Sequence, residues 1–280
     1  MDVHASRGAL AGLRLVFAGL VVFLYVPIAI LALFSFNDGD PAFPLAGLTL
    51  DWYRRFAANP LLIGALGRSA VVAVVSSTFA VSLGVLVAFA LVRRRVPMRA
   101  SVSALVFSPL VIPYVVFGVS LLVLFTAADK LLASSTGKVV GLGLHAVVIG
   151  HVVVSLPYTI LTIMPLLEGL NVSLEEAARD LGANPRQTFR RVTAPLLMPA
   201  LVSSFLIALT LSFDEYAIAS FLSGTQPTWP VFLFSQLRVP SQLPQLLAVS
   251  SVVLVISVGL VVAAEVSRRA SERRWASTTG

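Results

Sequence analysis

Residues 173–201 read SLEEAARDLGANPRQTFRRVTAPLLMPAL and form a charged segment between two long apolar runs. Ser173 and Glu176 match a capping box, in which a hydroxyl and a carboxylate satisfy the first free backbone N–H groups of a helix. Glu175 and Glu176 would lie in the first turn, where the helix dipole favours negative charge. The segment therefore predicts a helix that begins near Ser173.

The rest of this segment predicts a turn and a second helix. Ala177 and Ala178 favour a helix and leave a low surface that a partner can approach closely. Gly182 suits the end of this helix, because glycine adopts a left-handed backbone conformation without steric cost. Asn184 and Pro185 suit the cap and the first position of a second helix through RQTFRRV. We therefore expect a helix-turn-helix at a membrane surface.

The composition indicates an integral membrane protein. Of the 280 residues, 58% are hydrophobic and 12% are charged, and the mean hydropathy is +0.94. A soluble domain has about 45–50% apolar and about 25% charged residues. Crossing a hydrocarbon layer of about 30 Å takes roughly 20 apolar residues, so the chain can form about half a dozen spans with short loops. The chain has no cysteine, which excludes disulfides and thiolate catalysis.

Six apolar segments qualify as spans, so we predict an all-α polytopic protein with the charged loop between spans 4 and 5. The predicted spans are Leu15–Phe36, Ala70–Val92, Val102–Ala127, Val139–Leu167, Leu196–Leu222 and Leu246–Ala264. The third contains Pro109 and Pro113, which lack backbone N–H donors, so we expect a kink or a break there. Such a helix could line a pathway, although prolines are also ordinary in membrane helices.

The basic residues predict the orientation of the spans. With the N-terminus inside, fourteen of the 20 Lys and Arg residues lie on the cytoplasmic side and six lie outside, as the positive-inside rule requires. We therefore expect a cytoplasmic segment at 1–14, a single membrane domain at 15–267 with the charged loop at about 169–195, and a cytoplasmic tail at 268–280. Cytoplasmic arginines explain the net charge of +7 better than nucleic-acid binding does.

The charged loop has two interpretations. Taken alone, it could be an amphipathic connector that Arg186, Arg190 and Arg191 hold to anionic membrane lipid. Its spacing, however, is Glu-Ala-Ala, three residues, Gly182, nine residues and then Val192 to Pro195. This pattern resembles the EAA loop of permease subunits in binding-protein-dependent ABC importers, with Val192 in place of Ile and Ala194 in place of Leu.

The resemblance covers most of the chain and is closest to the second permease of spermidine/putrescine importers. It extends to the six spans, to SPLVIP at Ser108 to Pro113 and to the segment SFDEYAIASFLSG. It implies a bacterial inner-membrane protein that works with a second permease, two ATP-binding subunits and an extracytoplasmic binding protein. A polyamine is the leading solute; related permeases carry thiamine, ferric iron, aminoalkylphosphonates or opines.

The resemblance also implies how the loop works. Glu176, Ala177, Ala178 and Gly182 would form a helix that docks on a cytoplasmic ATPase, and Pro195 would return the chain to the membrane. The chain itself has no phosphate-binding GxxxxGK[ST] motif, since Leu132 stands where the first glycine should precede Gly137-Lys138. We therefore expect no enzymatic activity and no cofactor on this chain, with ATP used by the partner.

Two acidic residues near the end of the fifth predicted span are candidates for a substrate pathway. Asp214 and Glu215 would face protein or water, because a carboxylate at membrane depth costs several kcal/mol. Consecutive residues on a helix point about 100° apart, so at most one of them should line a cavity. Tyr216 could contact an ammonium group through its ring. Alternatively, the span ends at Phe213 and both acids lie in an outer loop.

Other chemistry has less support in the sequence. His145 and His151 could suggest a metal pair, but six residues apart on a helix they face away from each other, so hydrogen-bonded histidines are the better interpretation. A secondary transporter should show internal symmetry, with charged or interrupted helices in both halves. An intramembrane enzyme should show a nucleophile and base on the spans. Neither pattern is evident.

Overall fold

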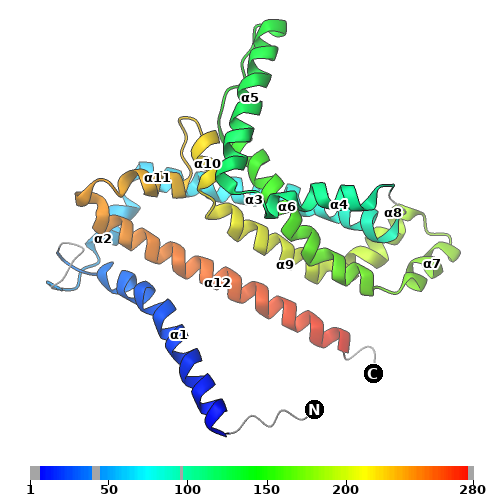
Figure 1. Ribbon diagram of the computed structural model, residues 1–280, viewed down its shortest axis with the longest axis horizontal. Helices are drawn as coiled ribbons and strands as arrows, with labels where there is room; N and C mark the ends of the chain where they lie inside the picture. Colours follow the sequence, from blue (N-terminus) through cyan, green and yellow to red (C-terminus); the bar gives the residue numbers. More distant parts are fainter. Residues whose placement is uncertain (1–6, 40–44, 95–96, 277–280) are drawn as a thin grey trace. The chain divides into compact units, whose positions relative to one another are not determined.

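The computed structural model describes residues 7–39, 45–94 and 97–276, which are almost entirely helical (Figure 1). Within these ranges, the one β contact is an isolated bridge between Asn37 and Leu48. The helical elements are α1 (Arg7–Phe34), α2 (Asp51–Ala57), α3 (Pro60–Arg93), α4 (Arg99–Phe107), η1 (Ser108–Leu110), α5 (Tyr114–Thr136), α6 (Leu144–Gly169), α7 (Val172–Asp180), α8 (Pro185–Thr188), η2 (Phe189–Thr193), α9 (Ala194–Phe213), α10 (Ala217–Leu222), α11 (Trp229–Gln236), η3 (Pro240–Gln242) and α12 (Leu243–Ala276).

Six helical stretches among the described residues are long and apolar enough to cross a membrane, which confirms the predicted number of spans. They are Gly12–Phe34, Pro60–Arg93, Tyr114–Thr136, Leu144–Gly169, Pro185–Phe213 and Pro240–Ala263. The predicted segments at 1–14 and 268–280 lie partly outside the described residues. Where they are described, α1 begins at Arg7 and α12 continues to Ala276.

The third predicted span is wrong in its bounds. The chain breaks at the two prolines: α4 ends at Phe107, Pro109 lies in the short η1 turn, and Pro113 precedes α5 with extended backbone angles. The apolar helix therefore starts at Tyr114 and runs to Thr136. Hydropathy alone could not find this break, because the residues around the two prolines are apolar. The predicted kink or break is confirmed.

The chain divides into two compact units. One comprises Met1–Pro60 and Ser235–Val255, and the other comprises Leu61–Phe234 and Ile256–Gly280. In the first unit, the short helix α2 is tied to the end of α1 and the residues after it. The indole N–H of Trp52 donates to the backbone oxygen of Asn37 at 2.8 Å, and the Tyr53 hydroxyl lies 2.7 Å from that of Ser35.

The second unit, hereafter the larger unit, contains the core and both candidate sites. One buried cluster joins α3, α6 and α10 through Val72, Ala146, Val147, Val154, Ile218, Ala219 and Leu222. A second cluster joins α3, α6 and α9 through Ala88, Ile163, Leu167, Leu170, Leu197 and Ala200. Both contain alanines with no exposed surface, as expected where membrane helices pack through small residues.

Near its start, α3 is held to the chain that precedes α11. The Arg68 guanidinium donates through Nε to the backbone oxygen of Pro227 at 2.8 Å, and the Ser69 hydroxyl accepts from the backbone N–H of Trp229 at 2.8 Å. The helix α3 begins at Pro60, ten residues before the predicted start at Ala70, and this contact lies within the additional residues. The Trp229 side chain is buried.

Close approach of α3 and α6 depends on Gly84. A Cβ atom at this position would meet Oγ1 and Cβ of Thr159. The hydroxyl cannot easily turn away, because it donates to the backbone oxygens of Ala80 at 3.1 Å and Leu156 at 2.8 Å. Gly84 thus lets the two helix backbones pack at short range.

We predict that Gly84→Ala destabilises the protein by about 1–3 kcal/mol, the usual cost of overpacking a core. The matched control is Gly67→Ala on the same helix, where nothing lies within 4 Å of the added Cβ. The control should leave thermal unfolding in detergent unchanged or raise its midpoint, because alanine favours helix over glycine. Equal midpoints for both variants would contradict this account of the α3–α6 contact.

Candidate functional site

The charged loop forms the predicted helix-turn-helix, but its first cap differs from the prediction. The helix α7 begins at Val172, and the Asn171 side chain accepts from the backbone N–H of Ser173 at 3.0 Å. The capping box that was assigned to Ser173 and Glu176 is therefore wrong, and of the two glutamates predicted in the first turn only Glu175 lies there. The cap is Asn171, two residues before Ser173, because the Asn171 amide oxygen accepts from a free backbone N–H in the first turn of α7.

The turn follows the prediction. The second helix begins at Pro185 as predicted, but it does not end before the fifth span: α8 continues through the π-helical segment η2 into α9. Gly182 has φ +83°, a left-handed conformation that disfavours any residue with a side chain, and its N–H donates to the Arg179 oxygen at 2.8 Å. Asn184 caps α8 by accepting from the N–H of Gln187 at 2.9 Å, and Pro185 occupies the first helical position. The Gln187 side-chain oxygen in turn accepts from the backbone N–H of Asn184 at 2.9 Å, a bond that was not predicted.

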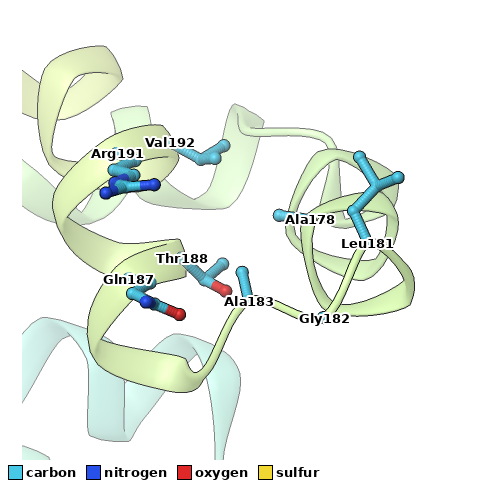
Figure 2. Close-up of a pocket in the computed structure, with 8 residues that line it drawn as sticks. All are labelled: Ala178, Leu181, Gly182, Ala183, Gln187, Thr188, Arg191 and Val192. Atoms are coloured by element: carbon cyan, nitrogen blue, oxygen red, sulfur yellow. The ribbon is translucent and has the colours of Figure 1, made fainter.

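The loop exposes most of the residues that were predicted to be functional. Glu176, Ala177 and Gly182 are exposed, Ala178 is half-buried, and Leu181 is 90% exposed on the turn. Figure 2 shows a groove between the end of α7 and the α8–η2 segment. The groove has a volume of about 360 Å³. Its lining residues are Ala178, Leu181, Gly182, Ala183, Gln187, Thr188, Arg191 and Val192. Pro195 lies in the first turn of α9, as expected for the return to a span.

Glu175 behaves differently from its neighbour Glu176. Its side chain is 10% exposed and lies 3.7 Å from Nε of Arg93 and 3.8 Å from Nη2 of Arg179. The Thr193 hydroxyl donates to the same carboxylate at 3.3 Å. From the sequence, Glu175 was expected to interact only with the helix dipole; the fold brings Arg93, from the end of α3, beside it.

The second candidate region lies where the fifth span ends. The predicted continuation of the helix to Leu222 is wrong: α9 ends at Phe213, and α10 begins at Ala217. The alternative end at Phe213 is correct for the helix, but Glu215 is not in a solvated loop, since it is 6% exposed. Its carboxylate accepts from the N–H groups of Ile218 at 2.9 Å and Ala219 at 3.0 Å.

His151 connects this break to the neighbouring spans. Its ring is fully buried, with Nε2 at 3.2 Å from a Glu215 carboxylate oxygen and Nδ1 at 2.7 Å from the Ser212 hydroxyl. The Ser212 hydroxyl lies 2.8 Å from that of Ser76. This chain of contacts joins α6, the α9–α10 break and α3. The prediction of hydrogen-bonded histidines is confirmed, since His145 also contacts the Gly141 oxygen at 3.1 Å.

A pocket of about 420 Å³ opens beside the break, lined by Tyr114, Thr210, Leu211, Asp214, Glu215, Tyr216 and Ala217. Asp214 is exposed, and among the described residues its carboxylate has no hydrogen-bond or ion-pair partner. The Tyr216 ring is 38% exposed and packs 4.8 Å from that of Phe234. Of the two candidate acids, only Asp214 is therefore available to a ligand.

The two candidate prolines do not line this pocket. Pro109 is buried in η1, and Pro113 sets the start of α5. Their break places Tyr114 at the first position of α5, where its hydroxyl lies 3.4 Å from that of Tyr158. The prolines thus contribute indirectly, by positioning a tyrosine at the pocket.

Comparisons with known proteins agree on one family. Residues 80–277 match the model of the binding-protein-dependent transport system inner membrane component. The chain is 33% identical over 248 residues to the spermidine/putrescine transport system permease protein PotC of Escherichia coli, covering 88% of this chain and 90% of the relative. It is 36% identical over 234 residues to the putrescine transport system permease protein PotI of Escherichia coli, covering 83% and 82%.

Solved structures show the same fold. A bacterial ABC transporter involved in the import of the acidic polysaccharide alginate matches with a TM-score of 0.72 at 15% identity, covering 94% of each chain. The MetNI methionine ABC transporter, in inward-facing conformations, matches with a TM-score of 0.55 at 22% identity, covering 75% of this chain and 96% of the other. At these identities, the matches support the architecture and not a shared solute.

We predict that Glu215→Gln lowers stability by about 2–3 kcal/mol, because the neutral amide cannot replace a buried carboxylate that accepts two backbone N–H groups and contacts His151. Asp214→Asn is the matched control, since the exposed side chain has no protein partner to lose. The measurement is thermal unfolding of each purified variant in detergent. A Glu215→Gln midpoint equal to that of Asp214→Asn would show that the carboxylate does not support the break.

Proposed function

The chain belongs to the family of binding-protein-dependent transport system inner membrane components, the permeases of ABC importers, and we propose that it carries a polyamine. The observation that carries this proposal is the similarity to two polyamine permeases over more than four-fifths of the chain. The exposed carboxylate of Asp214, beside the aromatic and apolar side chains that line part of the pocket, supports it.

The pocket offers two interactions suited to an organic cation. The carboxylate of Asp214 can pair with an ammonium group, and the exposed face of Tyr216 can add a cation–π contact worth about 0.5–2 kcal/mol. Apolar Leu211 and Ala217 complete a wall against which a methylene chain can pack. An ion with two or more ammonium groups separated by methylenes fits this combination better than an anion does.

The second part of the proposal concerns coupling to ATP. Glu176, Ala177, Ala178 and Gly182 form the surface on which a separate ATP-binding subunit docks, and Pro195 leads back to the membrane. Three of these residues are exposed and the fourth is half-buried, so a partner can reach them. The chain then binds no cofactor itself, and ATP is hydrolysed on the partner subunit.

The assembly follows from this role. We propose a transporter with a second permease subunit, two ATP-binding subunits and an extracytoplasmic binding protein, located in the bacterial inner membrane. The charged loop and both termini of this chain would face the cytoplasm, because fourteen of its 20 basic residues then lie on that side.

For the solute, we predict that Asp214→Asn reduces ATP-dependent uptake of radiolabelled putrescine by about tenfold, the effect of losing about 1.4 kcal/mol of interaction with the cation. The measurement uses the complete transporter in cells without other polyamine uptake. Asp51→Asn, which changes an exposed aspartate on α2, is the control. Normal uptake by Asp214→Asn would remove the pocket from the pathway, and no uptake by the unmodified transporter would contradict the polyamine assignment.

For the coupling surface, we predict that Glu176→Lys and Gly182→Asp each abolish uptake and capture of the ATP-binding subunit, while the permease still inserts into the membrane. Lysine reverses an exposed charge, and aspartate is strained at the positive φ of Gly182. Glu168→Lys is the control, since Glu168 is also exposed but lies in α6, before the loop. Capture of the ATP-binding subunit at the normal level would place the docking surface elsewhere.

A further inference from the structure

We propose that Arg93 is a positioning residue that joins the charged loop to α3, so that a movement of α7 carries α3 with it. The inference rests on the proposed docking of an ATP-binding subunit on this loop. It extends that proposal by naming the span that receives the movement and the contact that transmits it.

The contacts at the end of α3 form a partly buried joint. Arg93 donates through Nη2 to the backbone oxygen of Leu170 at 3.1 Å and contacts the Glu175 carboxylate through Nε at 3.7 Å. The Arg93 side chain is 16% exposed and that of Glu175 is 10% exposed. Thr193, just before α9, donates to the same carboxylate. Arg93 therefore contacts both Leu170, just before α7, and Glu175 in the first turn of α7.

Among the described residues, Arg93 provides the polar link between α3 and α7. The chain connects α7 to α6 on one side and, through α8 and η2, to α9 on the other. Movement of α7 reaches those two spans covalently, but α3 receives it only through side-chain contacts. Besides the Arg93 joint, the Phe89 ring meets the Phe189 ring edge-on at 5.6 Å, which keeps α3 close but, as an apolar contact, allows sliding.

A movement of α3 at Arg93 would affect other regions, because α3 also contacts them along its length. The helix has 34 residues, so it extends about 51 Å at 1.5 Å per residue. Near its start, Arg68 and Ser69 hold the chain at Pro227 and Trp229. Midway, the Ser76 hydroxyl contacts Ser212 beside the pocket. A shift at Arg93 therefore reaches both the pocket and the segment before α11 through one continuous helix.

The absence of cysteine from the natural chain permits a direct test. Gly67→Cys places a single thiol on an exposed position of α3, about 39 Å along the helix from Arg93. In the complete transporter, the rate of labelling by a membrane-impermeant maleimide is measured on this chain with and without ATP and vanadate. We expect the rate to change by about fivefold or more, the lower end of the coupling usually found between distant sites.

Removing the joint should abolish this response. Arg93→Gln and Glu175→Gln should each make labelling of Cys at position 67 insensitive to ATP while the ATP-binding subunit still co-purifies. The double variant should be no worse than either single one, because the two residues act through one contact. Arg94→Gln is the matched control, since Arg94 is the neighbouring arginine and is exposed, and it should keep the full response.

Three results would overturn the inference: no response to ATP in the unmodified Arg93 background, a full response in Arg93→Gln, or loss of the ATP-binding subunit in Arg93→Gln. The last would mean that Arg93 only maintains the shape of the loop. If the unmodified chain recovers no ATP-binding subunit at all, the proposed coupling function itself has failed. The two failures are therefore distinguishable.

Discussion

A backbone N–H or C=O group that leaves a helix inside a membrane must find another partner, because hydrocarbon offers none. This constraint governs both interruptions in the larger unit. At the first, Pro109 and Pro113 have no N–H to satisfy, which lowers the cost of the break. At the second, the Glu215 carboxylate accepts the N–H groups of Ile218 and Ala219 that α10 leaves free at its start. Residues next to both interruptions, Tyr114 and Glu215, line the pocket.

Two pairs of adjacent acidic residues, Glu175 with Glu176 and Asp214 with Glu215, share one arrangement. In each pair, one carboxylate is buried and braces the fold: Glu175 against Arg93, and Glu215 against His151 and backbone N–H groups. The other carboxylate, Glu176 or Asp214, is exposed. Adjacent side chains point in different directions, so a pair can support a surface and also present a charge on it. The buried member holds its exposed neighbour in place.

Polar contacts from three regions of the larger unit meet at α3. It contacts the charged loop at one end, the α9–α10 break in its middle and the segment before α11 near its start. The contacts are polar and specific in position, whereas the surrounding packing uses alanine, glycine and aliphatic side chains. Apolar packing resists separation of helices but tolerates sliding. The polar contacts fix the register, so that α3 moves with the elements it touches.

Local and compositional rules were sufficient for much of this protein. Hydropathy determined that six helices cross a membrane, and the sequence of the charged loop determined its two helices, the left-handed Gly182 and the Asn184 cap. These features depend on residues a few positions apart, or on total apolar length. The roles within each acidic pair, the burial of His151 and the contact of Arg93 with Glu175 depend on residues tens of positions apart. Only the tertiary structure decided them, because burial and charge pairing are set by which helices pack together.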